Sequence, residues 1–354
     1  MPKAEETDRG GPITGRKVTL RDVARRAGVH VSTASRALDE AGSGRIGPAT
    51  IERVRSAAVE LGYSRDLLAS GLKRGETKTI GVVVADLDNP HNAPVIRGIA
   101  RGLEAAEFVP LVAETAESRE RFERVLTHLT QRRIDALITS AAHLDGAEIL
   151  SWLVPADTPV VLAIRGLPGT DHDTVVHDDA TGGSLAAQHL VSLGHRRLAQ
   201  LAGPADIDTF VRRAGGFSRA VQAAAREEVS LPGRGSAAPD FDEGRRLMER
   251  LLDLPDCPTA VFAPTDVMAV GALDAIAGRG LRCPEDISVV GYNDIEMSRY
   301  ISPPLTTIEL PSEELGAEAA RMALAAIRHP EEAGGRLVEL PAGLVVRRST
   351  GPVP

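Results

Sequence analysis

The sequence of 354 residues is poor in cysteine, in aromatic side chains and in long apolar runs. Its two cysteines, Cys257 and Cys283, have neither a metal-binding nor a redox spacing, so no disulfide framework is expected. No apolar stretch approaches the roughly 18 residues that a membrane span needs, and residues 1–18 lack the apolar core of a signal peptide. These absences predict a cytoplasmic protein without a membrane partner.

Signatures of catalysis and of cofactor binding are also missing. There is no Gly-x-Ser-x-Gly elbow, and the glycine-rich segment 232–239 lacks the spacing of a phosphate-binding loop. His172 and His177 stand next to aspartates, but alternate residues of a strand point to opposite faces, so these groups do not converge. We expect no enzyme, no cofactor and no metal. An enzyme is the alternative, which turnover of a candidate substrate would favour.

Charge is distributed unevenly along a chain whose formal net charge is −8. Residues 1–75 contain 14 Lys and Arg against 9 Asp and Glu, a net charge of +5, and the remainder carries −13. A basic front end attracts the phosphates of nucleic acid, and an acidic body repels them. We therefore expect contact with DNA to be confined to the N-terminal part of the chain.

The segment TLRDVARRAGVHVSTASRAL (19–38) has the pattern of two short helices joined by a tight turn. Thr19 can cap the first helix, and Asp22 lies three residues on, where it can reach back to the cap. Gly28 can adopt the positive φ of a helix end. His30 is a weak cap for the second helix, so we expect a slightly frayed start. The polar side chains on this second helix suit a DNA major groove.

This pattern resembles the helix-turn-helix of the LacI/GalR family of bacterial transcriptional regulators, T-[LI]-x-D-V-A-x-x-A-G-V-S-x-x-T-V-S-R-x-L. The chain departs from it at His30, where the family usually has a capping serine, and at Ala34, where it usually has valine. By resemblance, base edges would be read by Val31, Ser32 and Arg36. The remaining DNA-binding residues implied for this segment are Thr19, Thr33 and Ser35, of which the last two would hold phosphates. A plain helical hairpin is the alternative.

The resemblance also orders the neighbouring segments. Residues 1–17 are expected to be a disordered arm and residues 18–64 the helix-turn-helix domain. By resemblance, residues 65–77 would be a hinge helix and linker, and the run is too short to form a stable helix alone in water. In the family this helix folds on operator DNA and inserts a leucine into the minor groove. Leu72 matches that leucine and Ala69 lies one turn earlier, whereas a plain linker is the alternative.

From residue 78 onward, strands alternate with amphipathic helices, which is typical of parallel α/β layers. The predicted fold class is α/β, with an N-terminal all-α helix-turn-helix domain and, by resemblance, a periplasmic-binding-protein-like domain at 78–354. That domain would contain two α/β subdomains with parallel sheets, linked by three crossovers. We expect the first at about 78–175 and 305–335, and the second at about 176–304 and 336–354.

The resemblance implies a small-molecule effector, sugar-like or a related metabolite, in the cleft between the subdomains. Arg213 corresponds to an arginine that commonly binds effector oxygens, and Phe241 to an aromatic platform for a ring. Purely structural roles are the alternatives to effector binding. Arg213 could form an ion pair on a loop with Asp206 or Asp208, and Phe241 could pack within a loop. The complete set of expected effector-binding residues is Asp86, His91, Asn92, Ser140, Arg213, Phe241, Thr265, Asn293 and Asp294.

Together these observations predict a sequence-specific transcriptional regulator, a repressor, that binds a pseudo-palindromic operator as a homodimer under effector control. The chain ends without a leucine heptad, so no tetramerisation bundle is expected. The alternative is a ligand-independent global or architectural regulator with a vestigial pocket. It draws support from Ile164 and Thr265, which replace polar effector contacts that are common in the family.

Overall fold

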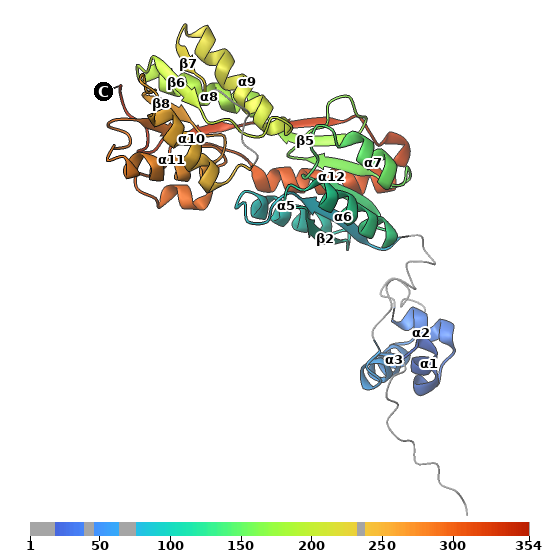
Figure 1. The fold of residues 1–354 in the computed structure, drawn as a ribbon. Helices are drawn as coiled ribbons and strands as arrows, with labels where there is room; N and C mark the ends of the chain where they lie inside the picture. Colours follow the sequence, from blue (N-terminus) through green and yellow to red (C-terminus); the bar gives the residue numbers. More distant parts are fainter. Residues whose placement is uncertain (1–17, 39–45, 64–75, 232–237, 354) are drawn as a thin grey trace, which may run out of the picture. The chain divides into compact units, whose positions relative to one another are not determined.

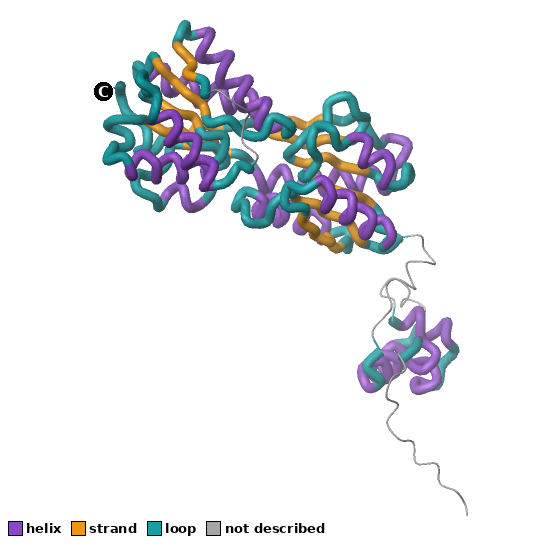
Figure 2. The backbone as a smooth tube through the Cα atoms, in the orientation of Figure 1, coloured by secondary structure: helices purple, strands orange, loops and turns teal. Residues whose placement is uncertain are grey.

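The computed structural model describes residues 18–38, 46–63, 76–231 and 238–353. The chain divides into two compact units, Met1–Glu76 and Thr77–Pro354. In the described ranges the first unit contains helices without strands, and the second combines both (Figures 1 and 2). None of the helices in these ranges has both the length and the apolar character needed to cross a lipid bilayer.

The first unit begins with α1 (Leu20–Ala27), whose ends are formed as the sequence predicts. The Asp22 carboxylate accepts hydrogen bonds from the backbone N–H of Thr19, at 3.0 Å, and from its hydroxyl, at 2.6 Å. At the other end Gly28 has φ 64°, a left-handed conformation that glycine adopts without a steric cost. The tight turn into the next helix therefore follows from these three residues.

The second and third helices, α2 (Val31–Ala37) and α3 (Pro48–Glu60), complete a small core with α1. The expected fraying at the start of α2 is not seen, because His30 Nδ1 accepts from the Ser32 N–H at 3.3 Å. Pro48 occupies the first turn of α3, as expected. Small side chains allow the helices to approach closely, and the buried set consists of Val23, Ala24, Ala34, Ala37, Val54, Ala57 and Ala58.

The second unit has two lobes. In the described residues the first lobe is built on a parallel sheet with the strand order β11-β5-β4-β3-β1-β2. Its strands are β1 (Thr79–Val84), β2 (Val109–Glu114), β3 (Ala136–Thr139), β4 (Val160–Ala163), β5 (Asp173–His177) and β11 (Leu337–Leu340). Its helices are α5 (Asn92–Glu104), α6 (Arg119–Gln131), α7 (Ala147–Leu153) and α12 (Ser312–Arg328).

The second lobe has a smaller parallel sheet, of strand order β7-β6-β8-β9 in the described ranges. Its strands are β6 (Arg197–Gln200), β7 (Glu227–Val229), β8 (Ala260–Phe262) and β9 (Ser288–Val290). The helices are α8 (Asp179–Ser192), α9 (Asp208–Ala223), α10 (Phe241–Leu252) and α11 (Asp266–Gly278). An antiparallel pair, β10 (Thr307–Glu309) and β12 (Gly343–Val345), continues beside β9 through single bridges. The short helices η2 (Glu296–Arg299) and η3 (Pro330–Glu332) complete the order.

Helix α12 comes late in the sequence but belongs to the first lobe, where Figure 1 shows it beside α5. The two helices pack at very short range: a Cβ on Gly98 of α5 would lie 2.0 Å from the carbonyl oxygen of Glu313. Only glycine fits such a backbone approach. The chain therefore returns to its first lobe after building most of the second.

Within the described residues the chain passes between the lobes three times, after β5, between β10 and α12, and between β11 and β12. The crossovers and the α/β class agree with the sequence prediction. The expected division is wrong at two short segments. Strand β11 (337–340) lies in the first sheet, although it was expected in the second subdomain, and residues 305–309 pair with the second lobe. Strands this short carry no signal of which sheet they join.

Candidate functional site

The exposed face of α2 in the first unit is polar. Ser32, Ser35 and Arg36 are exposed and Val31 and Thr33 half-buried, whereas the alanines of the helix face the core. Arg36 Nε donates to the Ser32 carbonyl at 3.2 Å, which leaves both terminal amino groups without a partner among the described residues. The arrangement suits an arginine that reaches a base edge. Thr19 is exposed at the start of α1; Ala69 and Leu72 lie outside the described residues.

A small cavity of about 40 Å³ lies between the two lobes of the second unit. This cavity, hereafter the cleft, has room for only a few water molecules. The structure brings most of the expected effector residues together on its walls: Asp86, His91, Asn92, Ser140, Arg213, Thr265 and Asn293. Asp294 and Phe241 are not among the lining residues. The cleft is also lined by Glu117, Arg165 and Phe210, which the sequence analysis did not identify.

Arg213 is a buried residue of helix α9, with 3% of its surface exposed. Its Nε donates to Asp179 Oδ1 at 2.8 Å and its Nη1 to the Pro264 carbonyl at 2.7 Å. The guanidinium carbon lies 3.9 Å from the centroid of the Tyr292 ring, an arrangement of a cation over an aromatic face. The remaining Nη2 donates to no residue of the described ranges, so it is available to a ligand in the cleft.

The alternative of a loop ion pair with Asp206 or Asp208 is therefore wrong. Arg213 lies within a helix, and Asp208 pairs with the neighbouring Arg212 at 3.0 Å. Arg212 also reaches Asp179, at 2.9 Å. Asp179 is thus a fully buried carboxylate with two arginines, and it accepts from the Tyr292 hydroxyl at 3.1 Å. Burial first, and then the Asp179 charge, raise the pKa of Tyr292 well above its ordinary value, so the phenol remains a donor.

The aromatic residue in the cleft is Phe210 and not Phe241. Phe241 is the first residue of α10 and is 36% exposed, and its carbonyl lies against Gly271 of α11. Its alternative interpretation, loop packing, does not describe it either, because the residue belongs to a helix and its side chain is partly exposed. Phe210 is 7% exposed and lies three residues before Arg213 in α9, on the same helix face. That spacing was the signal in the sequence that could have identified it.

Thr265 and Asp266 open helix α11 at the second-lobe wall. The Thr265 hydroxyl oxygen accepts from the Met268 N–H at 3.2 Å, so it caps the helix as well as lining the cleft. The Asp266 carboxylate is fully buried and accepts from the Thr307 hydroxyl, the Ser298 hydroxyl and the backbone N–H of Ile295. Burial raises the pKa of Asp266 to about 6 against the opposing effect of these hydrogen bonds. The pair fixes α11 to the segment that follows β9.

Asp294 points away from the cleft. It pairs with Arg347 at 2.6 Å and with Arg299 at 3.3 Å, and it lines a different cavity. The neighbouring Asn293 does line the cleft, and its Oδ1 has no hydrogen-bond partner although the residue is 7% exposed. Ser140 Oγ, on the opposite wall, also has no hydrogen-bond partner, and the residue is 6% exposed. Unpartnered buried polar atoms that face a cavity are positions where a ligand or water completes the hydrogen bonding.

The first-lobe wall is ordered by contacts of its own. Asn92 Nδ2 donates to the Asp86 carbonyl at 2.5 Å, and the Asn89 side chain accepts from the backbone N–H of His91 at 3.1 Å. Burial raises the pKa of the Asp86 carboxyl. Burial, the nearby His177 and Arg213 together hold the pKa of His91 well below its ordinary value, so its imidazole is neutral. These residues present hydrogen-bonding groups without a net positive charge.

A chain of hydrogen bonds joins the lobes at the edge of the cleft. Arg165 Nη1 donates to Glu117 Oε2 at 2.9 Å, and the same oxygen lies 3.2 Å from His143 Nε2. His143 Nδ1 lies 2.8 Å from Asp206 Oδ2, and Asp206 belongs to the second lobe. Burial acts to raise the pKa of Glu117, but hydrogen bonds from His143 and Arg165 lower it to about 2. The Glu117 carboxylate therefore stays charged and holds the imidazole toward the second lobe.

Within the described ranges, one group of three potential metal-ligand side chains converges: His329, Glu331 and Glu332. All three residues are exposed and none lines the cleft. His172 and His177 belong to no such group in these ranges. The cleft offers hydrogen-bonding groups, the free Nη2 of Arg213 and the aromatic face of Phe210. Together these groups are suited to binding a polar organic molecule.

Two family models match the chain. Residues 19–66 match bacterial regulatory proteins of the lacI family, and residues 187–350 match the periplasmic binding protein-like domain. The first match covers α1, α2 and α3, and the second extends from α8 to beyond β12.

Individual proteins match over nearly the whole chain. The HTH-type transcriptional repressor CytR of Escherichia coli (strain K12) is 34% identical over 348 residues, 95% of this chain and 97% of CytR. The solved complex of the transcriptional regulator CelR with cellobiose has a TM-score of 0.70 and 32% identity, covering 94% of this chain and 99% of CelR. The Lac repressor dimer bound to operator and the anti-inducer ONPF has a TM-score of 0.84 and 27% identity, covering 95% and 100%.

Proposed function

Because the chain belongs to the LacI family of bacterial regulatory proteins and is a DNA-binding transcriptional repressor rather than an enzyme, we propose that it acts in the cytoplasm as an effector-controlled homodimer. The dimer binds a pseudo-palindromic operator, and a sugar-like molecule in the cleft controls that binding. The proposal is supported by the presence of two features in one chain. The exposed face of α2 is polar, and the cleft contains buried polar atoms without hydrogen-bond partners.

DNA reading rests on α2. In this proposal Val31, Ser32 and Arg36 contact base edges, and Thr33 and Ser35 bind phosphates, which the exposure of Ser32, Ser35 and Arg36 supports. Thr19 at the start of α1 contacts the backbone of the same half-site. Ala69 and Leu72 stay with this proposal as a hinge that enters the minor groove, on family resemblance alone. Selection of bound duplexes from a random pool tests it: recovery of a two-fold symmetric, salt-sensitive site is the expected result.

Dimerisation rests on the surface of the first lobe. Strand β2 lies at the edge of its sheet, and Val109, Leu111 and Val112 on it are 64%, 38% and 37% exposed. An apolar edge strand left open favours pairing with another chain, and a two-fold axis would give the operator its symmetry. The solved Lac repressor is likewise a dimer on its operator. Light scattering on the full chain and on Leu111→Glu tests this, with a dimer and a weakened dimer as the expected results.

Effector control rests on the volume and the chemistry of the cleft. At about 40 Å³ the cleft does not hold a sugar ring, so a ligand must separate the lobes, and their relative motion can be transmitted along the chain. The polar atoms of Ser140 and Arg213 suit hydroxyl groups, and Phe210 offers a face for a ring. CelR was solved with cellobiose, which supports a sugar-like ligand. A thermal-shift screen of sugars and nucleosides tests it: a true effector at about 100 times its Kd adds about 2.7 kcal/mol of stability.

A second candidate function is ligand-independent regulation. It is favoured by the small volume of the cleft and by Ile164, an apolar residue on its wall. It predicts that no compound of the screen stabilises the protein while operator binding is intact. A compound that both stabilises the protein and changes its affinity for the operator decides for effector control.

A further inference from the structure

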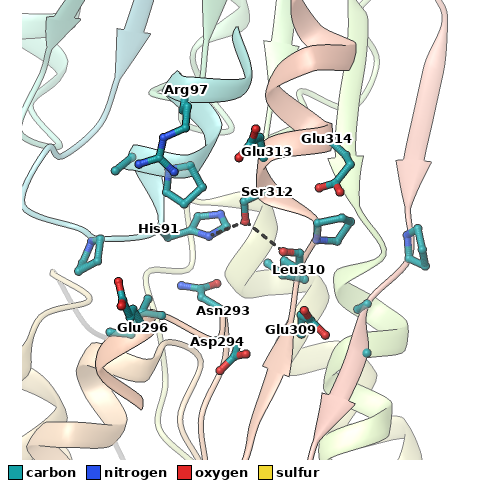
Figure 3. A pocket seen from close by; sticks show the side chains of 18 of the residues that line it. His91, Arg97, Asn293, Asp294, Glu296, Glu309, Leu310, Ser312, Glu313 and Glu314 are labelled. Atoms are coloured by element: carbon teal, nitrogen blue, oxygen red, sulfur yellow. Dashed lines mark hydrogen bonds between the residues drawn. The ribbon is translucent and has the colours of Figure 1, made fainter. Parts of the chain in front are cut away.

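A second cavity of about 930 Å³ lies beside the crossovers, and its volume falls within the range of small-molecule sites. Figure 3 shows its walls, which come from both lobes. The N-terminal halves of α5 and α12 supply Arg97, Glu313 and Glu314. The second lobe supplies Asn293, Asp294 and Glu296. Residues 309–312 and 341–343, at two of the crossovers, line it as well, together with residues 90–91 and 93–94 before and at the start of α5. It is called the crossover cavity below.

Carboxylates dominate the crossover cavity. Five line it: Asp294, Glu296, Glu309, Glu313 and Glu314. Asp294 is neutralised by Arg347, and Glu313 by Arg101. The other three form no ion pair with any described residue. Arg97 and Arg299 are the basic residues of the lining, and Arg299 is itself paired with Asp294. An excess of unpaired negative charge therefore faces the cavity.

Two buried polar atoms at the inner end of this cavity also lack partners. They are His91 Nε2 and Asn293 Oδ1, on residues that are 6% and 7% exposed. Both residues line the crossover cavity, and Figure 3 shows Asn293 beneath the His91 ring. Because burying an unpaired polar group is costly, atoms of this kind mark a place that a ligand completes.

The hydrogen-bonding role of His91 follows from Ser312. The Ser312 hydroxyl lies 3.3 Å from the Leu310 carbonyl oxygen, to which it donates, and 3.2 Å from His91 Nδ1. One hydroxyl proton cannot serve both contacts, so the assignment that satisfies both has Nδ1–H donating to Ser312. His91 Nε2 then carries a lone pair. Asn293 Oδ1 is an acceptor by nature, and the inner end therefore presents two acceptors and requires a donor.

We propose that the crossover cavity binds an organic cation with more than one protonated amine, of the polyamine class. An ammonium group at the inner end donates to His91 Nε2 and Asn293 Oδ1, and further ammonium groups along the molecule face Glu309, Glu314 and Glu296. A bare metal ion fits less well, because among the described residues no three ligand side chains of this lining converge.

Because the crossover cavity lies next to the cleft, a cation bound in it would change the affinity of the cleft for its ligand. His91 and Asn293 also line the cleft, so the two cavities share a wall. A cation that bridges both lobes favours one arrangement of them, and it thereby changes the affinity of the cleft for its own ligand. The site is separate from the effector proposal, because its occupancy is measurable without an effector and without DNA.

Calorimetric titration of the full-length protein with spermidine, in the absence of DNA, tests the proposal. We expect saturable binding of one spermidine per chain. The double variant Glu309→Gln, Glu314→Gln should weaken it by about tenfold or more, since each removed charge faces the bound cation. Glu148→Gln, an exposed carboxylate on α7, is the matched control and should bind as the wild type does. Unfolding temperatures without spermidine show whether each variant is folded.

Three results would overturn the proposal. The first is the lack of saturable binding by the wild type at millimolar spermidine. The second is an unchanged affinity in the double variant, which would place the cation elsewhere. The third is displacement of spermidine by Mg²⁺ at equal charge concentration, because that would mean that the carboxylates collect counterions without recognising an amine.

Discussion

The ring of His143 in the first lobe contacts Asp206 in the second lobe, and the neighbouring Leu144 adds a backbone hydrogen bond to the same residue. The ring Nδ1 lies 2.8 Å from Asp206 Oδ2, and the backbone N–H of the next residue, Leu144, donates to the Asp206 carbonyl at 2.8 Å. The other ring nitrogen faces Glu117, which Arg165 holds in place. Both nitrogens thus face carboxylates, and only the protonated ring can donate to both. The two hydrogen bonds of the His143 ring, one to each lobe, therefore depend together on one proton.

The first prediction concerns pH. The hydrogen bond with Glu117 raises the pKa of His143 against the effect of burial, and Asp206 adds to it, whereas Arg165 opposes it. A raised pKa in the folded state gives stability that is fully present below the ordinary value of 6.5 and is lost as pH rises through the folded value. We expect His143→Gln to lower the free energy of unfolding by about 1 kcal/mol at acidic pH and by less at alkaline pH.

The measurement is the difference in unfolding free energy between wild type and His143→Gln across the pH range. The difference is needed because His91 and His177 are buried, and their lowered pKa values give the opposite trend in each protein alone. His329→Gln, at an exposed histidine that does not line the cleft, is the control. A difference that grows as pH rises would contradict the assignment of the proton to His143.

The second prediction concerns Arg36. Its exposed guanidinium is free at both terminal nitrogens within the described ranges, so Arg36→Ala should cost about 1 to 3 kcal/mol on the preferred operator and relax the preference at one base pair. Arg53→Ala, at an exposed arginine of α3, should weaken binding without changing the preferred bases. Fluorescence anisotropy on single-base operator variants measures both. Equal weakening of Arg36→Ala on all sequences would mean that Arg36 binds phosphate instead.

The third prediction concerns the buried charges behind the cleft. Asp179 is fully buried against Arg212, Arg213 and the Tyr292 hydroxyl, so Asp179→Ala leaves a buried guanidinium without its counter-charge. We expect a loss of about 3 to 5 kcal/mol in the free energy of unfolding. The adjacent Asp178 caps α8 through the Thr181 N–H at 2.9 Å, and Asp178→Ala should cost only about 1 kcal/mol. Urea unfolding of both variants gives the comparison, and equal losses would contradict the role assigned to Asp179.

Local chemistry made much of the fold predictable. Thr19, Asp22 and Gly28 fix the ends of α1 through contacts within a few residues, and the alternation of strands and helices fixes the α/β class. The short strands β10 and β11 were misassigned because their lobes are set by distant pairing. The resemblance located seven of the nine expected cleft residues, whereas Glu117 and Arg165 lie 48 residues apart in sequence and meet only in the fold. No local pattern reveals such a pair.

The last prediction separates two aromatic residues that the sequence alone did not distinguish. Phe210 lines the cleft beside Arg213, whereas Phe241 stands 36% exposed at the start of α10. With an effector found by the thermal-shift screen, Phe210→Ala should weaken effector binding by about 1 to 3 kcal/mol, because the ring face that packs on the ligand is lost. Phe241→Ala should leave the affinity unchanged. Calorimetry on both variants, each first checked for its unfolding temperature, gives the answer. A weakened Phe241→Ala with an unaffected Phe210→Ala would restore the platform that the family resemblance implied, and it would require α10 to move toward the cleft when the ligand binds.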